Sequence, residues 1–206
     1  LACRTRLTLL GAVFKEAAPV VNEQGCNMPH PIEMSRMTET IVIAPSVVLN
    51  CAIAETAARF MHEVASPAAK SEFGAEVKSI AQASGFVCRP RNGTAKLSEH
   101  AFGNALDIAS FTLADGRRIS VKDGWKGLPE EQGFLRDVQG AACQQFNTVL
   151  APGSNVYHYD HIHVDLMRRS SGRIICQPAA VSGEEIAARA APRGYAQPRD
   201  LVERAR

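Results

Sequence analysis

The sequence lacks the long apolar runs that mark membrane-spanning helices. Nowhere do about 18 apolar residues follow one another without interruption, so no membrane span is expected. A strong charge of either sign is also missing, because 23 lysine and arginine residues oppose 21 aspartate and glutamate residues, a formal net charge of +2. So small and scattered a charge is untypical of nucleic-acid-binding domains. We therefore expect neither a membrane span nor a nucleic-acid partner.

The sequence shows no internal repeat and no signal peptide. No basic segment and no apolar segment precede Cys3, so any export signal is expected to have been removed upstream. The 206 residues have an ordinary globular composition, with 46% hydrophobic and 21% charged residues. We expect an irregular N-terminal arm over residues 1–45, a main domain over 46–176 and a tail over 177–206.

The cysteines form no CxxC pair of the kind found in zinc knuckles or thioredoxin-like sites. Six are spread along the chain: Cys3, Cys26, Cys51, Cys88, Cys143 and Cys176. Their even number and wide spacing favour disulfides, which would imply an oxidising compartment such as the periplasm or the cell exterior. Buried free thiols in a cytosolic protein are the alternative, and the sequence does not select a pairing.

Hydrophobic periodicity predicts both helices and strands. The expected helices cover residues 47–64 and 130–147, and the expected strands cover 76–81, 104–111, 118–121 and 161–167. Ser46 is the expected N-cap of the first helix, Ser66-Pro67 is its expected end, and a second short helix is expected to start at Pro67. A hairpin turn is expected at residues 114–117.

Half of the six histidines fall within six residues, at His158, His161 and His163, and His100 lies seven residues before Asp107. Imidazole and carboxylate are the usual ligands of catalytic zinc, and three protein ligands leave a fourth position for water. His100, Asp107 and one histidine of the run therefore predict a zinc-type metal site.

Strand alternation places His161 and His163 on one face, so one can bind metal while the other forms a hydrogen bond. Asp107 lies on a predicted strand that would present its carboxylate to a pocket. The alternatives are a pair of surface histidines and an aspartate in a cap or ion pair. Asp165 lies on the same face and could orient a ligand.

The two motifs carry a family resemblance. The first consists of Ser98, His100, Gly103, Ala105 and Asp107, and the second of His161 and His163. Together they resemble the bacterial extensin-like C-terminal family. That family is similar in turn to the zinc D-Ala-D-Ala peptidases and to the penicillin-insensitive murein endopeptidase, which share SxHxxGxAxD followed by HxH. The resemblance extends from about Cys3 to about Asp165.

The resemblance implies zinc on His100, Asp107 and His163. It also implies that Arg89 faces the substrate, where a planar and permanently charged donor would neutralise an oxyanion or a carboxylate. A surface arginine in a loop is the alternative for Arg89.

The general base is left open by the resemblance. The D-Ala-D-Ala peptidases use a glutamate three residues before the last zinc histidine, and Asp160 stands there in this sequence. The HxxHxH pattern of the murein endopeptidase is matched instead by His158, His161 and His163. Either Asp160 or His161 could accept the proton of zinc-bound water.

These observations lead to the hypothesis of a zinc peptidase-like catalytic domain with an α+β fold, in which helices pack on one side of a small antiparallel sheet. The expected activity is zinc-dependent hydrolysis of an amide next to D-alanine in peptidoglycan peptides, as a DD-endopeptidase or DD-carboxypeptidase of the bacterial cell envelope. The alternative is a non-catalytic zinc-containing protein that binds the cell wall or acts as a scaffold. A plant-type extensin is excluded, because Ser-Pro repeats are missing.

Overall fold

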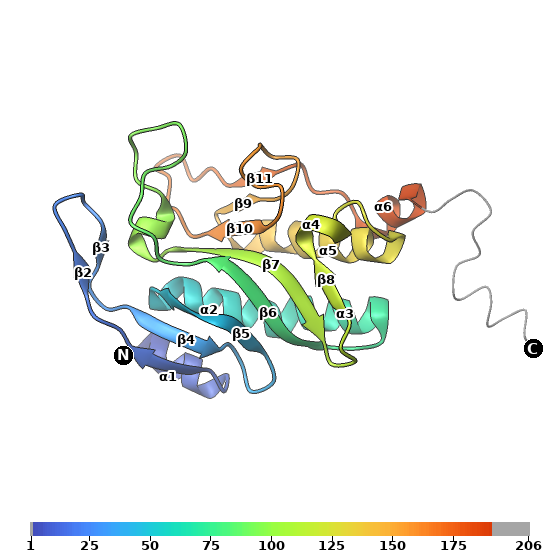
Figure 1. The fold of residues 1–206 in the computed structure, drawn as a ribbon, viewed down its shortest axis with the longest axis horizontal. Helices are drawn as coiled ribbons and strands as arrows, with labels where there is room; N and C mark the ends of the chain where they lie inside the picture. Colours follow the sequence, from blue (N-terminus) through green and yellow to red (C-terminus); the bar gives the residue numbers. More distant parts are fainter. Residues whose placement is uncertain (1, 191–206) are drawn as a thin grey trace, which may run out of the picture.

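The computed structural model describes residues 2–190 (Figure 1). The helices are α1 (Ala2–Leu9), α2 (Cys51–Phe60), the π-helix η1 (Met61–Ala65), α3 (Ser66–Phe73), the 3-10 helix η2 (Glu99–Phe102), α4 (Val121–Gly124), α5 (Pro129–Gln145) and α6 (Gly183–Ala190). The strands are β1 (Val13–Glu16), β2 (Val20–Val21), β3 (Asn27–Met28), β4 (Ile32–Arg36), β5 (Val42–Leu49), β6 (Val77–Ser84), β7 (Ala105–Leu113), β8 (Arg118–Ser120), β9 (Thr148–Leu150), β10 (Ile162–Asp165) and β11 (Ile175–Gln177).

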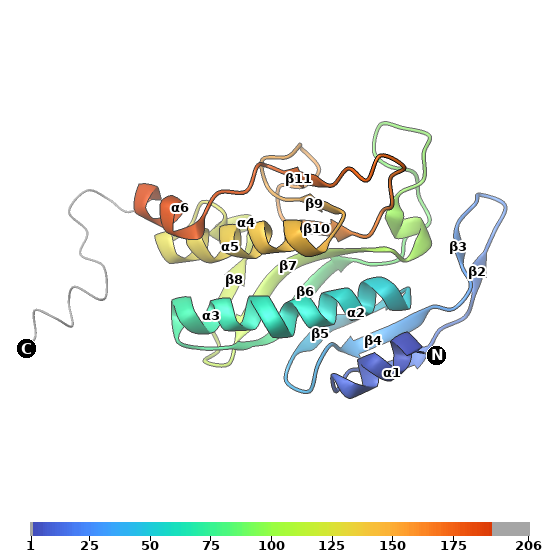
Figure 2. The ribbon, with the colours of Figure 1, turned by 180° about the vertical axis from the view of Figure 1, so that it is seen from behind.

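One nine-stranded sheet runs through the molecule in the order β1-β4-β5-β6-β7-β10-β9-β11, with β8 paired to β7. Helices α2, α3 and α5 cover one face of this sheet, as the view from behind shows (Figure 2). Among residues 2–190, no long helix lies across the opposite face (Figure 1). The strands β2 and β3 form a separate hairpin.

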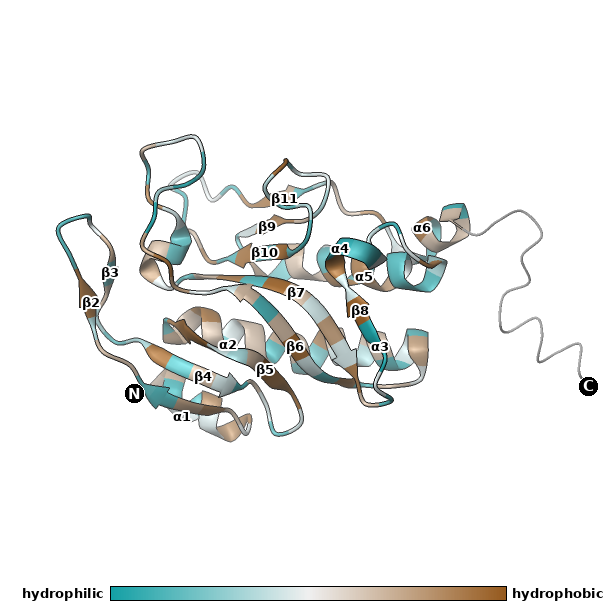
Figure 3. Cartoon of the chain, in the orientation of Figure 1, coloured by the Kyte–Doolittle hydropathy of each residue, from teal (hydrophilic) through white to brown (hydrophobic). Residues whose placement is uncertain are grey.

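The core lies between the sheet and these helices. Hydrophobic residues run along β5, β6 and β7 (Figure 3). Phe111 of β7 packs edge-on against Phe134 of α5, with ring centroids 5.2 Å apart. Leu106 and Ile108 of β7 are also buried in this core, whereas Asp107 between them takes the other side of the strand.

The predicted α+β class is confirmed. The sheet is larger than expected, and its pairs β5–β6 and β9–β11 are parallel. Parallel pairing of β5 with β6 requires a crossover, which α2, η1 and α3 supply. The hairpin at residues 114–117 joins β7 to β8 as predicted.

The first long helix begins later than predicted. Residues 47–49 belong to β5, and Asn50 rather than Ser46 is the N-cap, since its side chain accepts a hydrogen bond from the Ile53 amide at 3.1 Å. The second short helix expected from Pro67 is present as α3, but the helical path reaches it without a break at Ser66-Pro67. Pro67 lies in the first turn of α3, where a missing amide hydrogen is tolerated.

The first 45 residues are more regular than expected, because they contain α1 and strands β1 to β4. The prolines Pro19, Pro29 and Pro31 fall between the short strands rather than within them, so they do not interrupt pairing. The division of the chain into arm, catalytic domain and tail stays a prediction.

All six cysteines are disulfide-bonded, in the pairs Cys3–Cys51, Cys26–Cys88 and Cys143–Cys176. The first two bridges join the N-terminal 45 residues to the rest of the fold, one at the start of α2 and the other next to Arg89. Within residues 2–190, every helix is too short or too polar to cross a membrane.

Candidate metal centre

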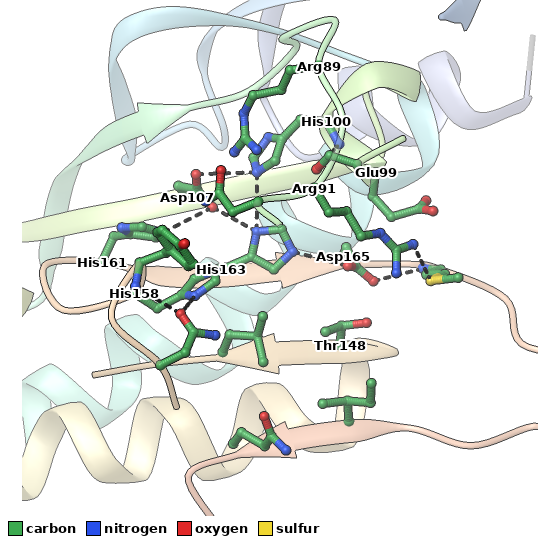
Figure 4. A pocket seen from close by; sticks show the side chains of 18 of the residues that line it. Arg89, Arg91, Glu99, His100, Asp107, Thr148, His158, His161, His163 and Asp165 are labelled. Carbon is green, nitrogen blue, oxygen red and sulfur yellow. Dashed lines mark hydrogen bonds and ion pairs between the residues drawn. The ribbon is translucent and has the colours of Figure 1, made fainter. Parts of the chain in front are cut away.

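Three predicted metal ligands come together beside the open face of the sheet (Figure 4). His100 lies on η2, Asp107 on β7 and His163 on β10. The antiparallel register of β7 and β10 places Asp107 directly opposite His163. One ligand atom from each of the three buried residues lies within 4.8 Å of the others. The expected triad can therefore hold a metal ion.

The other residues of the first motif shape the turn that delivers His100. The Ser98 hydroxyl accepts a hydrogen bond from the His100 amide at 3.4 Å, which caps η2. Gly103 ends η2 with φ of 58°, and a Cβ on it would lie 2.9 Å from the Asn50 amide nitrogen and against the Met28 sulfur. Glycine is therefore required by both the dihedral angle and the space.

The facing atoms of the triad are close together. His163 Nδ1 lies 2.8 Å from Asp107 Oδ1, and His100 Nε2 lies 3.3 Å from Asp107 Oδ2. The two ring nitrogens are 3.2 Å apart. Such a set of nitrogen and carboxylate atoms requires a cation among them, either a proton or a metal ion.

The outer nitrogen of each histidine already has an acceptor. His100 Nδ1 lies 2.6 Å from the Gly85 carbonyl oxygen, and His163 Nε2 lies 3.0 Å from Asp165 Oδ2. When these nitrogens donate, His100 Nε2 and His163 Nδ1 keep their lone pairs for a metal. The donor set therefore fits a divalent ion with imidazole and carboxylate ligands, such as zinc.

The electrostatics of the cluster agree with a cation at this point. Burial alone would raise the pKa of Asp107, but the hydrogen bonds from His100 and His163 outweigh it and hold that pKa well below its usual range. Burial alone would lower the pKa of His163, but its hydrogen bonds to Asp107 and Asp165 raise the pKa to about 9. Without a metal, the His163 ring is therefore a cation between two carboxylates at neutral pH.

Asp165 is held in turn by its own partners. Its Oδ1 accepts a hydrogen bond from the Met167 amide at 2.9 Å, and it hydrogen-bonds the Thr148 hydroxyl. That hydroxyl also accepts a hydrogen bond from Arg169 Nη2 at 2.7 Å. A continuous chain of contacts thus runs from Arg169 through Thr148 and Asp165 to His163, in agreement with the expected orienting position of Asp165.

The two candidate bases are in contact with each other. His161 Nδ1 lies 2.8 Å from Asp160 Oδ1, and His161 Nε2 lies 3.6 Å from Asp107 Oδ1. His161 therefore points toward the triad, whereas Asp160 contacts the far side of its ring. His158 packs against His161, with ring centroids 5.1 Å apart, and its Nδ1 lies 2.7 Å from Asn155 Oδ1. Burial, together with the nearby His163 and His161, lowers the pKa of His158 to about 4.

A cavity of roughly 330 Å³ adjoins the triad. Arg89 lines it and lies beside His100 (Figure 4), and its role toward a substrate stays a prediction. Arg91 and Arg169 line it as well, and sequence reasoning missed both. Of the three arginines, the resemblance assigned a role to Arg89 alone, and no local pattern distinguishes the other two from surface arginines. The remaining histidines, His30 and His62, are exposed and do not line this cavity.

The comparisons with known proteins add one match. A family model described as the extensin-like protein C-terminus matches residues 1–177. No curated protein and no solved structure matches the chain. Since the match covers most of the chain and includes the whole metal centre, this chain belongs to the extensin-like protein C-terminus family.

Proposed function

We propose that this protein is a zinc-dependent hydrolase of peptidoglycan peptides that cleaves an amide next to D-alanine in the cell envelope. The observation that carries the proposal is the convergence of His100 Nε2, Asp107 and His163 Nδ1 on one point, with both outer ring nitrogens already hydrogen-bonded. The adjoining cavity gives this point access to a substrate. The likeness of the motifs to those of the zinc D-Ala-D-Ala peptidases supports the choice of reaction.

A bound zinc ion would act as a Lewis acid toward the scissile carbonyl and lower the pKa of water. In the proposed mechanism, His161 Nε2 accepts the proton from the attacking water and passes it to the leaving amine. Asp160 positions this group, because its carboxylate holds the other ring nitrogen of His161 at 2.8 Å. The geometry thus favours His161 over Asp160 as the base.

Two other residues complete the proposed site. Arg89 lines the cavity beside His100, where its guanidinium would neutralise developing negative charge or a substrate carboxylate. His158 stays neutral near pH 7, because its pKa is lowered to about 4, so it can accept a hydrogen bond from the substrate without adding positive charge.

The proposed location in an oxidising compartment, such as the periplasm, rests on the three disulfides. Proteins kept in the reducing cytosol seldom retain such bridges. The proposed partners are the peptide stems of peptidoglycan.

Digestion of purified muropeptides, with and without a chelator, tests the activity. We expect cleavage only with zinc, and a loss of at least about 100-fold in kcat/KM for His161→Ala. His62→Ala is the matched control, because His62 is exposed on η1 and outside the cavity, and it should retain full activity. Unchanged muropeptides at saturating zinc would overturn the enzyme proposal and favour a non-catalytic wall-binding or scaffold protein.

A further inference from the structure

Exposed apolar side chains follow one another in the chain segment next to the cavity. Val156, Tyr157 and Tyr159 lie between β9 and β10, with exposed fractions of 77%, 53% and 58%. Tyr157 itself lines the cavity. His158, between the two tyrosines, packs instead against His161 and His163. The same segment thus presents histidines to the metal centre and aromatic rings to the solvent.

The rim has a different character near His100. Arg89 and Arg91 line the cavity there, together with Asn92. In Figure 4, Arg89 lies beside His100, whereas His158 lies beside His161 on the other side of Asp107. The arginines Arg89 and Arg91 thus lie at a different part of the cavity lining from His158 and His161, and Tyr157 is next to His158 in the chain.

We infer that Tyr157 and Tyr159 form a platform for uncharged sugar rings of the peptidoglycan glycan strand. This inference rests on the proposed function, because the peptides of peptidoglycan are attached to such a strand. A pyranose ring has an apolar C–H face and polar hydroxyl edges. Tyrosine offers a matching amphipathic surface, with an aromatic face and a phenolic hydroxyl, and loses little side-chain entropy when it binds.

The size and charge of the site favour a sugar over a peptide at this rim. A cavity of roughly 330 Å³ is at the small end of ligand pockets, so much of a larger substrate must lie outside it. Stem peptides carry carboxylates, which are better matched by the guanidinium groups of Arg89 and Arg91. The uncharged saccharide is then the part of the substrate that fits the exposed tyrosines.

Binding of an uncharged tetrasaccharide of N-acetylglucosamine to the full chain, measured by NMR titration in the presence of a chelator, tests the platform without any need for catalysis. We expect saturable binding that is weakened at least about tenfold in the double variant Tyr157→Ala/Tyr159→Ala. The double variant Tyr157→Phe/Tyr159→Phe keeps the rings and should bind within about threefold of the parent chain. Val21→Ala, a change at an exposed apolar residue of β2, should leave binding unchanged.

Failure to bind the tetrasaccharide, or equal binding by the parent chain and the double alanine variant, would overturn the platform. So would weakened binding of a sugar-free stem peptide, rather than of the tetrasaccharide, in the double alanine variant. If the tetrasaccharide binds through the tyrosines but no muropeptide is cleaved, the proposed hydrolysis fails while the platform stands.

Discussion

His163 uses both ring nitrogens for separate tasks, and Asp165 decides which of them faces the metal position. Both oxygens of Asp165 act as acceptors, Oδ2 for His163 Nε2 and Oδ1 for the Met167 amide. In Asp165→Asn, the side-chain NH2 would have to face one of these two donors. We therefore expect zinc affinity to fall about 10- to 100-fold, as measured by competition with a chromophoric chelator.

The control for this variant is Asp123→Asn, which removes the same charge from the exposed residue Asp123 of α4. It should bind zinc like the parent chain. Parent-like zinc affinity in Asp165→Asn would mean that Asp165 has no orienting role.

The disulfide Cys26–Cys88 joins two segments that lie outside the nine-stranded sheet. Cys26 precedes β3 in the small β2–β3 hairpin, and Cys88 lies in the loop that carries Arg89. The bridge spans 62 residues, so its removal frees a long segment in the unfolded chain. We expect the double variant Cys26→Ala/Cys88→Ala to lose roughly 2–4 kcal/mol of unfolding free energy, measured by urea denaturation.

Removal of this bridge should leave zinc affinity within about threefold of the parent value, because the ligands lie on η2, β7 and β10 rather than on the bridged segments. If the double variant lost zinc binding but kept its stability, the expectation that the metal ligands are held independently of this disulfide would be wrong.

Helices, strands and turns were predicted best where the local residue pattern fitted one kind of structure alone. Residues 104–111 were predicted as a strand and form most of β7, and the turn before β8 contains Asp115-Gly116. The helix beginning at Cys51 was misplaced because Val47 and Val48 fit a helical as well as a strand pattern, and their pairing with β4 decides for the strand. Short strands such as β9 depend on pairing with distant segments, which local periodicity does not reveal.

The metal triad was predictable because its residues lie in two compact motifs. Their contact follows from the antiparallel register of β7 and β10, which the two strand predictions allowed but did not fix. The outer contacts were less accessible to prediction. Gly85 contributes only a backbone carbonyl, and Thr148 and Arg169 reach Asp165 and its neighbours through pairing of separate segments.

At the scale of the whole molecule, the protonation of His163 couples stability to pH when no metal is bound. Its folded pKa of about 9 lies above the ordinary 6.5, so its contribution is complete below about pH 6.5 and is lost as pH rises through 9. The lowered pKa values of Asp107 and His158 act below this window. We expect the unfolding free energy of the chelated protein to fall between about pH 7 and pH 9, by at most about 1.4 kcal/mol per pH unit.

Urea denaturation at several pH values measures this dependence, and the zinc-loaded protein is the reference, because a bound metal replaces the proton. A fall in stability of equal size with and without zinc would assign the effect to other groups. A flat curve without zinc would show that His163 is neutral in the metal-free protein.

The position of Asp107 has a further consequence for how the two halves of the site move. Its strand β7 pairs with β6, β8 and β10 inside the sheet, so its amide should exchange with solvent deuterium only when the sheet opens. Residues 92–96, beyond Arg91, are exposed, and their loop is closed by the bridge between Pro90 and Leu97 and by a hydrogen bond from the Arg91 amide to the Lys96 carbonyl oxygen. Amides in this loop should exchange far sooner. We therefore expect the strand that carries Asp107 to be more rigid than the exposed residues 92–96.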